Sequence, residues 1–320
     1  AGFKKAYPDR FVECGVAEQN MMGLAAGMAQ FGKIPFTSSY AVFSPGRNWD
    51  QIRVSVCYGE ANVKIAAAHA GISVGPDGAT HQALEDLASV RALPNLIIFS
   101  PCDSIETKKA TMAAAKIKGP VYIRFARSGT PVITTEKSSF KPGKAEILRE
   151  GKDVSIVATG PLVYEALLAA ECLAQKPKAL KLLFSRYPAI ARNSKKSKHH
   201  GHSKEQAKET ILWSPPKIKR MLRKLGKINA EIINVHTIKP FDNKTIAASA
   251  KKTGLVITVE EHQITGGLRG AVAESLSLHQ PTKIIPIGMP NRFGESGKPE
   301  ELLEKYCMTA PWIIHALSQK

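Results

Sequence analysis

A largely apolar run at residues 62–68, which leads directly into a glycine-rich loop, constrains the fold more than any other segment. Such a run is typical of a parallel strand that is buried on both faces of a sheet. Other strands and helices are expected to alternate around it. The expected strands are residues 34–40, 62–68, 96–99 and 121–125, and the expected helices are residues 49–56, 83–92 and 104–116. This alternation predicts an α/β domain with a mostly parallel sheet.

A second alternation follows a Pro-, Thr- and Lys-rich segment at residues 130–144. Its expected strands are residues 154–158, 231–235, 255–259 and 283–287, and its expected helices are residues 163–175, 243–252, 266–276 and 299–307. A chain of 320 residues is long enough for two such domains. We therefore predict two parallel-sheet α/β domains, at residues 1–135 and 136–320.

Residues 176–227 connect an expected helix to an expected strand, a connection that usually has about 2–6 residues. The stretch holds 16 Lys and Arg against two acids, which accounts for +14 of the formal net charge of +18. We expect a solvated basic insertion in the second domain, without which the protein still folds, with basic amphipathic helices at its ends, near residues 180–183 and 218–225. A nucleic-acid or acidic-surface patch is the alternative, but the stretch has no aromatic ladder for stacking on single strands.

The sequence also argues against a metal site, a disulfide framework and a membrane-spanning segment. His199, His200 and His202 could contact a metal, but no fourth ligand is apparent, so we expect no metal site. The five cysteines are scattered and lack Cys-x-x-Cys spacing, which argues against a disulfide framework and favours a reducing cytoplasm. No apolar run approaches the roughly 18 residues that span a membrane.

The segment around Glu18 places an acid at the start of an unusual helix. A short strand is expected at residues 10–14, then a glycine turn, then an apolar helix whose first turn contains Glu18. An acid at that position stabilises the positive end of the helix dipole. The helix carries Gly23 and Gly27 in its interior, where a glycine costs about 1 kcal/mol. We therefore expect another backbone to approach this helix closely, and Glu18 to lie at a packed interface.

The loop at residues 69–82 follows the strand at residues 62–68, at the edge of an open α/β sheet where ligands bind. His69, Asp77 and His81 share this loop, and its glycines would let the backbone approach a ligand closely. From these residues alone, a ligand site and a polar surface loop are both possible interpretations.

Together, Gly-Val-Ala-Glu-Gln at residues 15–19 and the loop at residues 69–82 resemble the transketolase family of thiamine diphosphate enzymes. Further motifs that fit this family are Tyr-Ala-Val-Phe at 40–43, Ala-Leu-Glu-Asp-Leu at 83–87, Arg-Phe-Ala-Arg at 124–127 and Val-Glu-Glu-His-Gln-Ile-Thr-Gly-Gly at 259–267. The resemblance covers residues 1–175 and 228–320. It implies a pyrimidine-binding domain, without its first β–α unit, followed by the family's C-terminal domain.

The resemblance implies thiamine diphosphate as the cofactor and Glu18 as the glutamate that hydrogen-bonds N1′ of its aminopyrimidine ring. In the family this contact favours the imino tautomer, whose 4′-nitrogen removes the C2 proton intramolecularly. Tyr40 and Phe43 match the aromatic bed of the ring, although core packing is the commoner role of aromatic residues. The Gly-Asp-Gly…Asn-Asn motif that holds Mg²⁺ and the diphosphate in this family is absent from the sequence, so a separate N-terminal subunit is expected to carry it.

The resemblance also assigns residues to a phosphorylated sugar substrate. It implies that Asp77 contacts a sugar hydroxyl and that His81, a second catalytic residue, lies near the reacting carbons. His69 and Arg127 match positions that face the terminal phosphate, for which arginine is the natural bidentate donor. Arg124 is left outside the site and is expected to be a surface charge.

The expected function is that of the C-terminal subunit of a split transketolase. It would move a two-carbon ketol unit from a ketose phosphate to an aldose phosphate, with Mg²⁺ and an N-terminal partner, as a dimer of such pairs. Deoxyxylulose-phosphate synthase and the β subunit of a 2-oxo-acid dehydrogenase remain alternatives, because all three use the glutamate in the same way. An inactive homologue that acts as a basic nucleic-acid-associated protein is an alternative of a different class.

Overall fold

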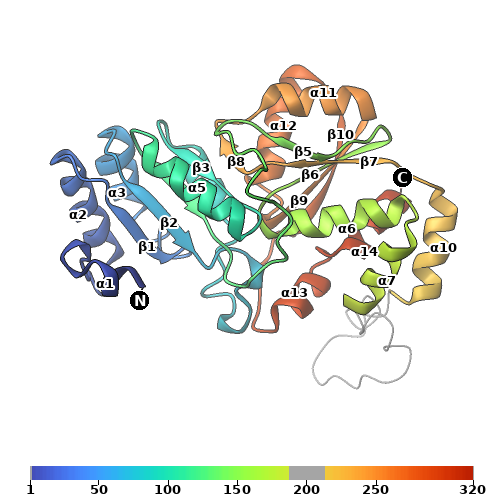
Figure 1. Cartoon of the computed structure of the whole chain (residues 1–320), viewed down its shortest axis with the longest axis horizontal. Coiled ribbons are helices and arrows are strands. Elements are labelled where there is room, and N and C mark those ends of the chain that lie inside the picture. Colours follow the sequence, from blue (N-terminus) through green and yellow to red (C-terminus); the bar gives the residue numbers. More distant parts are fainter. Residues whose placement is uncertain (1, 187–212, 320) are drawn as a thin grey trace.

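The computed structural model describes residues 2–186 and 213–319, which form two α/β units side by side (Figure 1). In spatial order, the first sheet consists of β1 (Phe36–Tyr40), β2 (Lys64–Ala68), β4 (Val121–Arg124), β3 (Ile97–Phe99) and β8 (Thr237–Lys239). The second sheet consists of β10 (Lys283–Met289), β9 (Leu255–Gln263), β6 (Val154–Ala158), β7 (Ala230–Asn234) and β5 (Glu146–Arg149). In each sheet the first four strands are parallel and the last is antiparallel. The predicted fold class is confirmed.

Helices flank both sheets. The first unit contains α1 (Gly2–Ala6), η1 (Pro8–Arg10), α2 (Glu18–Gln30), α3 (Trp49–Gln51), η2 (Ile52–Tyr58), η3 (Ile72–Asp77), α4 (Asp86–Arg91) and α5 (Ser104–Lys116). The second contains η4 (Gly160–Leu162), α6 (Val163–Leu173), α7 (Pro177–Arg186), α10 (Pro215–Leu225), α11 (Asn243–Thr253), α12 (Leu268–His279), α13 (Pro299–Lys305) and α14 (Ala310–Ser318). The strand expected at residues 10–14 is wrong, because Arg10 ends η1 and residues 11–14 pair with no strand of the described chain.

The buried strand β2 contains a lysine, and its environment explains how a cation fits there. Lys64 is wholly buried, and burial lowers its pKa to about 8. Its Nζ donates to Asn62 Oδ1 at 2.7 Å and to the backbone oxygens of Ile117 and Gly119 at 2.8 and 2.6 Å. Those two carbonyls lie just past the end of α5, where the helix dipole favours positive charge.

Arg124, at the end of β4, is almost wholly buried and joins the two units. Its Nε and Nη2 donate to the two carboxylate oxygens of Asp86 at 2.9 and 3.1 Å, and Tyr122 Oη donates to Asp86 at 3.0 Å. Nη2 also donates to the backbone oxygens of Ala83 and Glu261 at 3.2 and 2.9 Å. The expectation that Arg124 is a surface charge is therefore wrong, because a full set of acceptors lets this cation lie in the interior.

Helices α7 and α10 are the two ends of the basic stretch at residues 176–227, and they lie at the end of the second unit that is away from the first (Figure 1). Leu183, Ile218 and Leu222 are buried in the core of that unit, whereas Leu182 is 46% exposed. The predicted amphipathic helices are confirmed. The expectation of a solvated stretch is wrong at both ends, because these apolar faces belong to the core.

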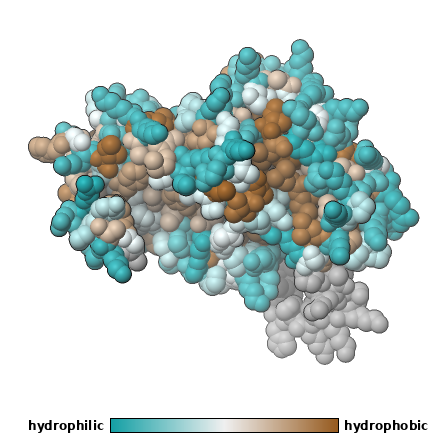
Figure 2. Space-filling model, in the orientation of Figure 1, coloured by the Kyte–Doolittle hydropathy of each residue, from teal (hydrophilic) through white to brown (hydrophobic). Residues whose placement is uncertain are grey.

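The polar faces of the two helices point to solvent, and the outer edge of the second unit, where α10 lies, is mostly hydrophilic (Figure 2). On α10 the exposed cations are Lys217, Lys219, Arg220, Arg223 and Lys224. The polar centre of the stretch, including His199, His200 and His202, lies outside the described residues.

We predict that deleting residues 176–227 will lower the melting temperature by more than about 8 °C, because the loss of three buried aliphatic side chains costs several kcal/mol. Replacing only residues 187–212 by a flexible linker should change it by less than about 4 °C, because both helices remain. Leu183→Asp and its exposed neighbour Leu182→Asp form a matched pair for the same melting experiment. Equal melting temperatures for the two deletions would show that α7 and α10 add nothing to the core.

We predict that Arg124→Met will lower the free energy of unfolding by about 3–5 kcal/mol, because it leaves the Asp86 carboxylate buried without its cation. The control is Lys108→Met, which removes an ion pair with Glu136 in which both side chains are exposed, 70% and 69%. That pair should contribute less than about 1 kcal/mol. Urea denaturation followed by circular dichroism measures the free energy of unfolding of both variants. An effect of Arg124→Met as small as that of Lys108→Met would contradict the structural role of Arg124.

Candidate active site

The predicted site residues come from elements that meet at the carboxyl edge of the first sheet. Tyr40 is the last residue of β1, His69 follows β2 directly, and Glu18 is the first residue of α2. The others lie in the segments that follow β1, β2 and β4: Phe43, Asp77, His81 and Arg127. The carboxyl ends of parallel strands lie at one edge of a sheet, so these residues become neighbours although they are far apart in the sequence.

Glu18 is buried, with 7% of its surface exposed. Its Oε1 accepts a hydrogen bond from Ser39 Oγ at 3.0 Å, and its Oε2 accepts one from Arg47 Nη1 at 3.1 Å. Burial raises the pKa of Glu18, but hydrogen bonds from its own backbone, Arg47 and Ser39 outweigh burial and hold the pKa below its usual value. An ionised carboxylate with both oxygens engaged therefore lies at the start of α2.

Four of the seven predicted site residues, Tyr40, Phe43, His69 and His81, form one ring cluster. Tyr40 stacks on His69, with 4.1 Å between ring centroids and 8° between ring planes, and lies nearly parallel to Phe43 at 6.1 Å and 16°. His81 stands edge-on to Phe43 at 5.3 Å and to Tyr40 at 5.8 Å. The guanidinium carbon of Arg47 lies 4.0 Å from the centroid of Phe43, so Arg47 connects the cluster to Glu18.

His69 is the most constrained member of the ring cluster. Its backbone has φ of +57°, a left-handed conformation that is costly for a residue other than glycine. Its Nδ1 is buried and has no hydrogen-bond partner among the described residues. Burial, and then the charge of Arg127, lower its pKa, so the ring is neutral near pH 7. A ligand that accepted or donated a hydrogen bond at Nδ1 would satisfy this buried polar atom.

Asp77 and Arg127, both predicted to bind substrate, contact each other. Arg127 Nη1 donates to Asp77 Oδ1 and to the backbone oxygen of Val74, each at 2.7 Å. Both side chains are partly exposed, 35% for Arg127 and 26% for Asp77, so the pair lies at the mouth of the site.

The loop at residues 69–82 is anchored by the second unit. Glu261, in β9, is buried and its Oε2 accepts from the backbone N–H of Ser73 at 3.0 Å. Gly71 has φ of +90°, and a Cβ there would lie 2.4 Å from the same carboxylate oxygen. Gln82 Nε2 donates to the backbone oxygen of Glu295 at 2.9 Å. The loop that carries three predicted site residues is therefore held at both ends by residues about 190–210 positions away.

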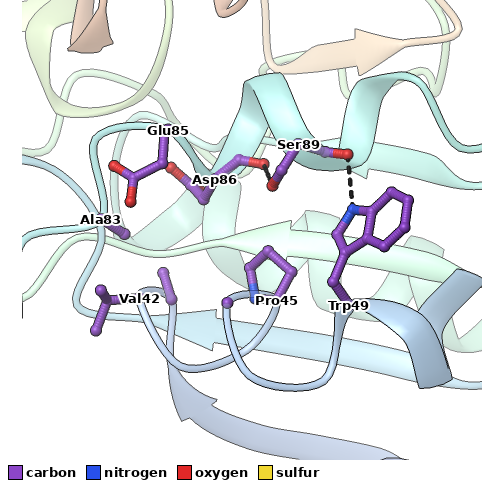
Figure 3. A pocket seen from close by; sticks show the side chains of 9 residues that line it. Val42, Pro45, Trp49, Ala83, Glu85, Asp86 and Ser89 are labelled. Carbon is purple, nitrogen blue, oxygen red and sulfur yellow. Dashed lines mark hydrogen bonds between the residues drawn. The ribbon is translucent and has the colours of Figure 1, made fainter.

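A separate cavity of about 300 Å³ lies beside this site, between the segment that follows β1 and the start of α4 (Figure 3). Trp49 closes one side, and its Nε1 donates to the backbone oxygen of Ser89 at 3.0 Å. The acids on its wall are already engaged, since Glu85 accepts from the Leu84 N–H and Asp86 pairs with Arg124. None of the predicted site residues lines this cavity.

Sequence reasoning missed Arg47, Ser39 and Glu261. Arg47 follows Phe43 by four residues in the turn after β1, a spacing that could have suggested contact with the ring. Nothing local indicates Ser39, and Glu261 lies in the motif at residues 259–267 without a local sign that it holds the loop. Within residues 2–186 and 213–319, no group of three or more His, Cys, Asp or Glu could hold a metal ion, and every helix is too short or too polar to cross a membrane.

Comparison with protein families identifies two domains in the chain. A model of the transketolase pyrimidine-binding domain matches residues 1–132, and a model of the transketolase C-terminal domain matches residues 143–182 and 217–313. The second match includes most of α10 and more than half of α7. The domain boundary expected at residues 135 and 136 stays a prediction.

Comparison with individual proteins separates split relatives from single-chain ones. A transketolase C-terminal section from Methanocaldococcus jannaschii is 41% identical, with 100% of this chain and 85% of that protein aligned. A 6-deoxy-6-sulfo-D-fructose transketolase subunit from a Clostridium species is 37% identical, with 98% and 82% aligned. Human transketolase is 33% identical, but the match covers only 43% of that protein.

Solved structures of transketolases resemble this chain in the same way. A protein described as a split-gene transketolase, inactive β4 tetramer, is 40% identical and superimposes with a TM-score of 0.77 over 100% of this chain and 86% of that one. Transketolase from Campylobacter jejuni, at 21% identity and a TM-score of 0.64, shares the fold over 97% of this chain and 39% of that one. The chain therefore belongs to the transketolase family, as the C-terminal subunit of a split transketolase.

Proposed function

We propose that this chain is half of a two-chain enzyme that moves a two-carbon ketol unit from a ketose phosphate to an aldose phosphate in the cytoplasm. The observation that carries the proposal is a buried carboxylate, Glu18, that Arg47 connects to a ring cluster at the carboxyl edge of the first sheet. The named relatives are transketolases or parts of them. They favour this function over deoxyxylulose-phosphate synthase, a 2-oxo-acid dehydrogenase subunit or a nucleic-acid-binding protein.

The residues at the site fit the pyrimidine half of thiamine diphosphate, the cofactor of this family. Glu18 offers a buried carboxylate oxygen to a ring N–H, and Tyr40 and Phe43 offer aromatic faces for stacking. The unsatisfied Nδ1 of His69 leaves a polar position for a ligand. The described residues provide no acidic cluster for Mg²⁺, so we assign the metal and the diphosphate to an N-terminal partner subunit.

The cofactor, when bound, supplies the carbon nucleophile that accepts the ketol unit. Glu18 would hold a proton at N1′ of the pyrimidine ring, where the negative charge of its carboxylate stabilises the protonated ring nitrogen. Tyr40 and Phe43 would fix the plane of that ring and exclude water from it. The imidazole of His81, edge-on to both rings, would move a proton near the reacting carbons.

The substrate would bind at the mouth of the site. Arg127 would bind the terminal phosphate together with His69, and Asp77 would accept a hydrogen bond from a sugar hydroxyl. Arg127 and Asp77 are paired at 2.7 Å without substrate, so phosphate would compete with Asp77 for the guanidinium. This competition would release Asp77 for the hydroxyl as the phosphate binds.

The small-residue face of α2 is a candidate subunit interface. A Cβ added at Gly23 or Gly27 would meet nothing within 4 Å, so the close backbone approach expected from the sequence does not occur among the described residues. Nearby apolar side chains are exposed, 42% for Leu24 and 86% for Phe31. We propose that another subunit covers this face in a dimer of two-chain pairs, and that the chain alone is inactive, as the β4 tetramer named above is described.

We predict that Glu18→Gln will lower ketol transfer by at least about 100-fold, because an amide cannot hold the proton at N1′. The test uses the chain reconstituted with its N-terminal subunit, thiamine diphosphate and Mg²⁺. Activity is compared with deuterium exchange at C2 of the cofactor, followed by NMR. The control is Glu13→Gln, which changes an exposed glutamate five positions earlier. Unchanged activity and exchange in Glu18→Gln would remove Glu18 from the mechanism, whereas a lowered melting temperature would indicate loss of fold instead.

A further inference from the structure

Arg47 occupies a position between the two groups that define the pyrimidine site. It lies in the turn between β1 and α3 and donates from Nη1 to Glu18 Oε2 at 3.1 Å. Its planar guanidinium lies over the face of Phe43, 4.0 Å from the ring centroid. The side chain is 49% exposed, whereas Glu18 is 7% exposed, so Arg47 covers the carboxylate from the solvent side.

These two contacts reproduce what a protonated aminopyrimidine would do at the same place. Such a ring would stack on Phe43 and donate its N1′–H to a Glu18 oxygen. Ser39 already occupies Oε1 of Glu18, so Oε2, the oxygen bound by Arg47, is the one that such a ring would use. One face of Tyr40 is also covered, by His69 at 4.1 Å. The guanidinium and a pyrimidine ring therefore compete for one ring face and one carboxylate oxygen.

We propose that Arg47 closes the aminopyrimidine site in the free chain and must swing out before the pyrimidine ring of the cofactor binds. This inference rests on the proposed function, because it takes Glu18 and Phe43 to form that site. The half-exposed side chain can leave into solvent without disturbing the core. An ion pair and a cation–π contact of this exposure favour the closed state by only about five- to tenfold, so the closure is reversible.

The test measures binding of the aminopyrimidine fragment alone, 4-amino-5-hydroxymethyl-2-methylpyrimidine, to the full chain by ligand-observed NMR. The fragment carries no diphosphate, so no metal or partner is needed. Arg47→Ala should bind it about five- to tenfold more tightly than the unmodified chain. The matched control is Arg53→Ala, an exposed arginine six positions later, which should change nothing. Equal or weaker binding by Arg47→Ala would overturn the closure.

A second readout on the same proteins separates failure of the closure from failure of the proposed function. Without ligand, the carboxyl carbon of Glu18 is titrated by ¹³C NMR, and its pKa should rise in Arg47→Ala, because Arg47 is one of the groups that lower it. An unchanged Glu18 titration would show that the contact does not form in solution, which overturns the closure alone. If no variant binds the fragment although the titration shifts, the pyrimidine site itself, and with it the proposed function, is wrong.

Discussion

The buried guanidinium of Arg124 fixes the elements that carry the candidate active site. Arg124 neutralises Asp86 and donates to backbone oxygens of both units, so the start of α4, the end of β4 and the middle of β9 have fixed relative positions. Glu261, whose backbone oxygen Arg124 holds, in turn fixes Ser73 through its carboxylate. The loop that carries His69, Asp77 and His81 thus depends on an ion pair that touches none of them.

This anchoring explains why charged and polar side chains can lie together at the carboxyl edge of the first sheet. Burial destabilises the charged carboxylate of Glu18, and a left-handed backbone conformation destabilises His69. Such features persist only where the surrounding structure fixes them. In the free chain, arginines neutralise two carboxylates of the site: Arg47 pairs with Glu18, and Arg127 pairs with Asp77. Both arginines lie where an incoming ligand would have to displace them.

Sequence reasoning found what local pattern determines and missed what distant contacts determine. The parallel strands were predictable because mostly apolar runs indicate burial on both faces of a sheet, as in β6, whose residues are all buried. The antiparallel edge strands β5 and β8 were missed, because segments of only four and three residues pair only once the sheet exists. The roles of Arg47 and Glu261 were not predictable, because each acts on a residue 29 or 188 positions away. The apolar faces of α7 and α10 were visible in the sequence, but their burial depended on the surface of α6 and α14.

The central claim is that this chain carries the pyrimidine and substrate half of a site that a second subunit completes. Titration calorimetry with thiamine diphosphate and Mg²⁺ tests it most directly, first on this chain alone and then on its mixture with the N-terminal subunit. The account predicts little heat from the chain alone, and tight binding with ketol transfer from the mixture. Micromolar or tighter binding of thiamine diphosphate by the chain alone would contradict it.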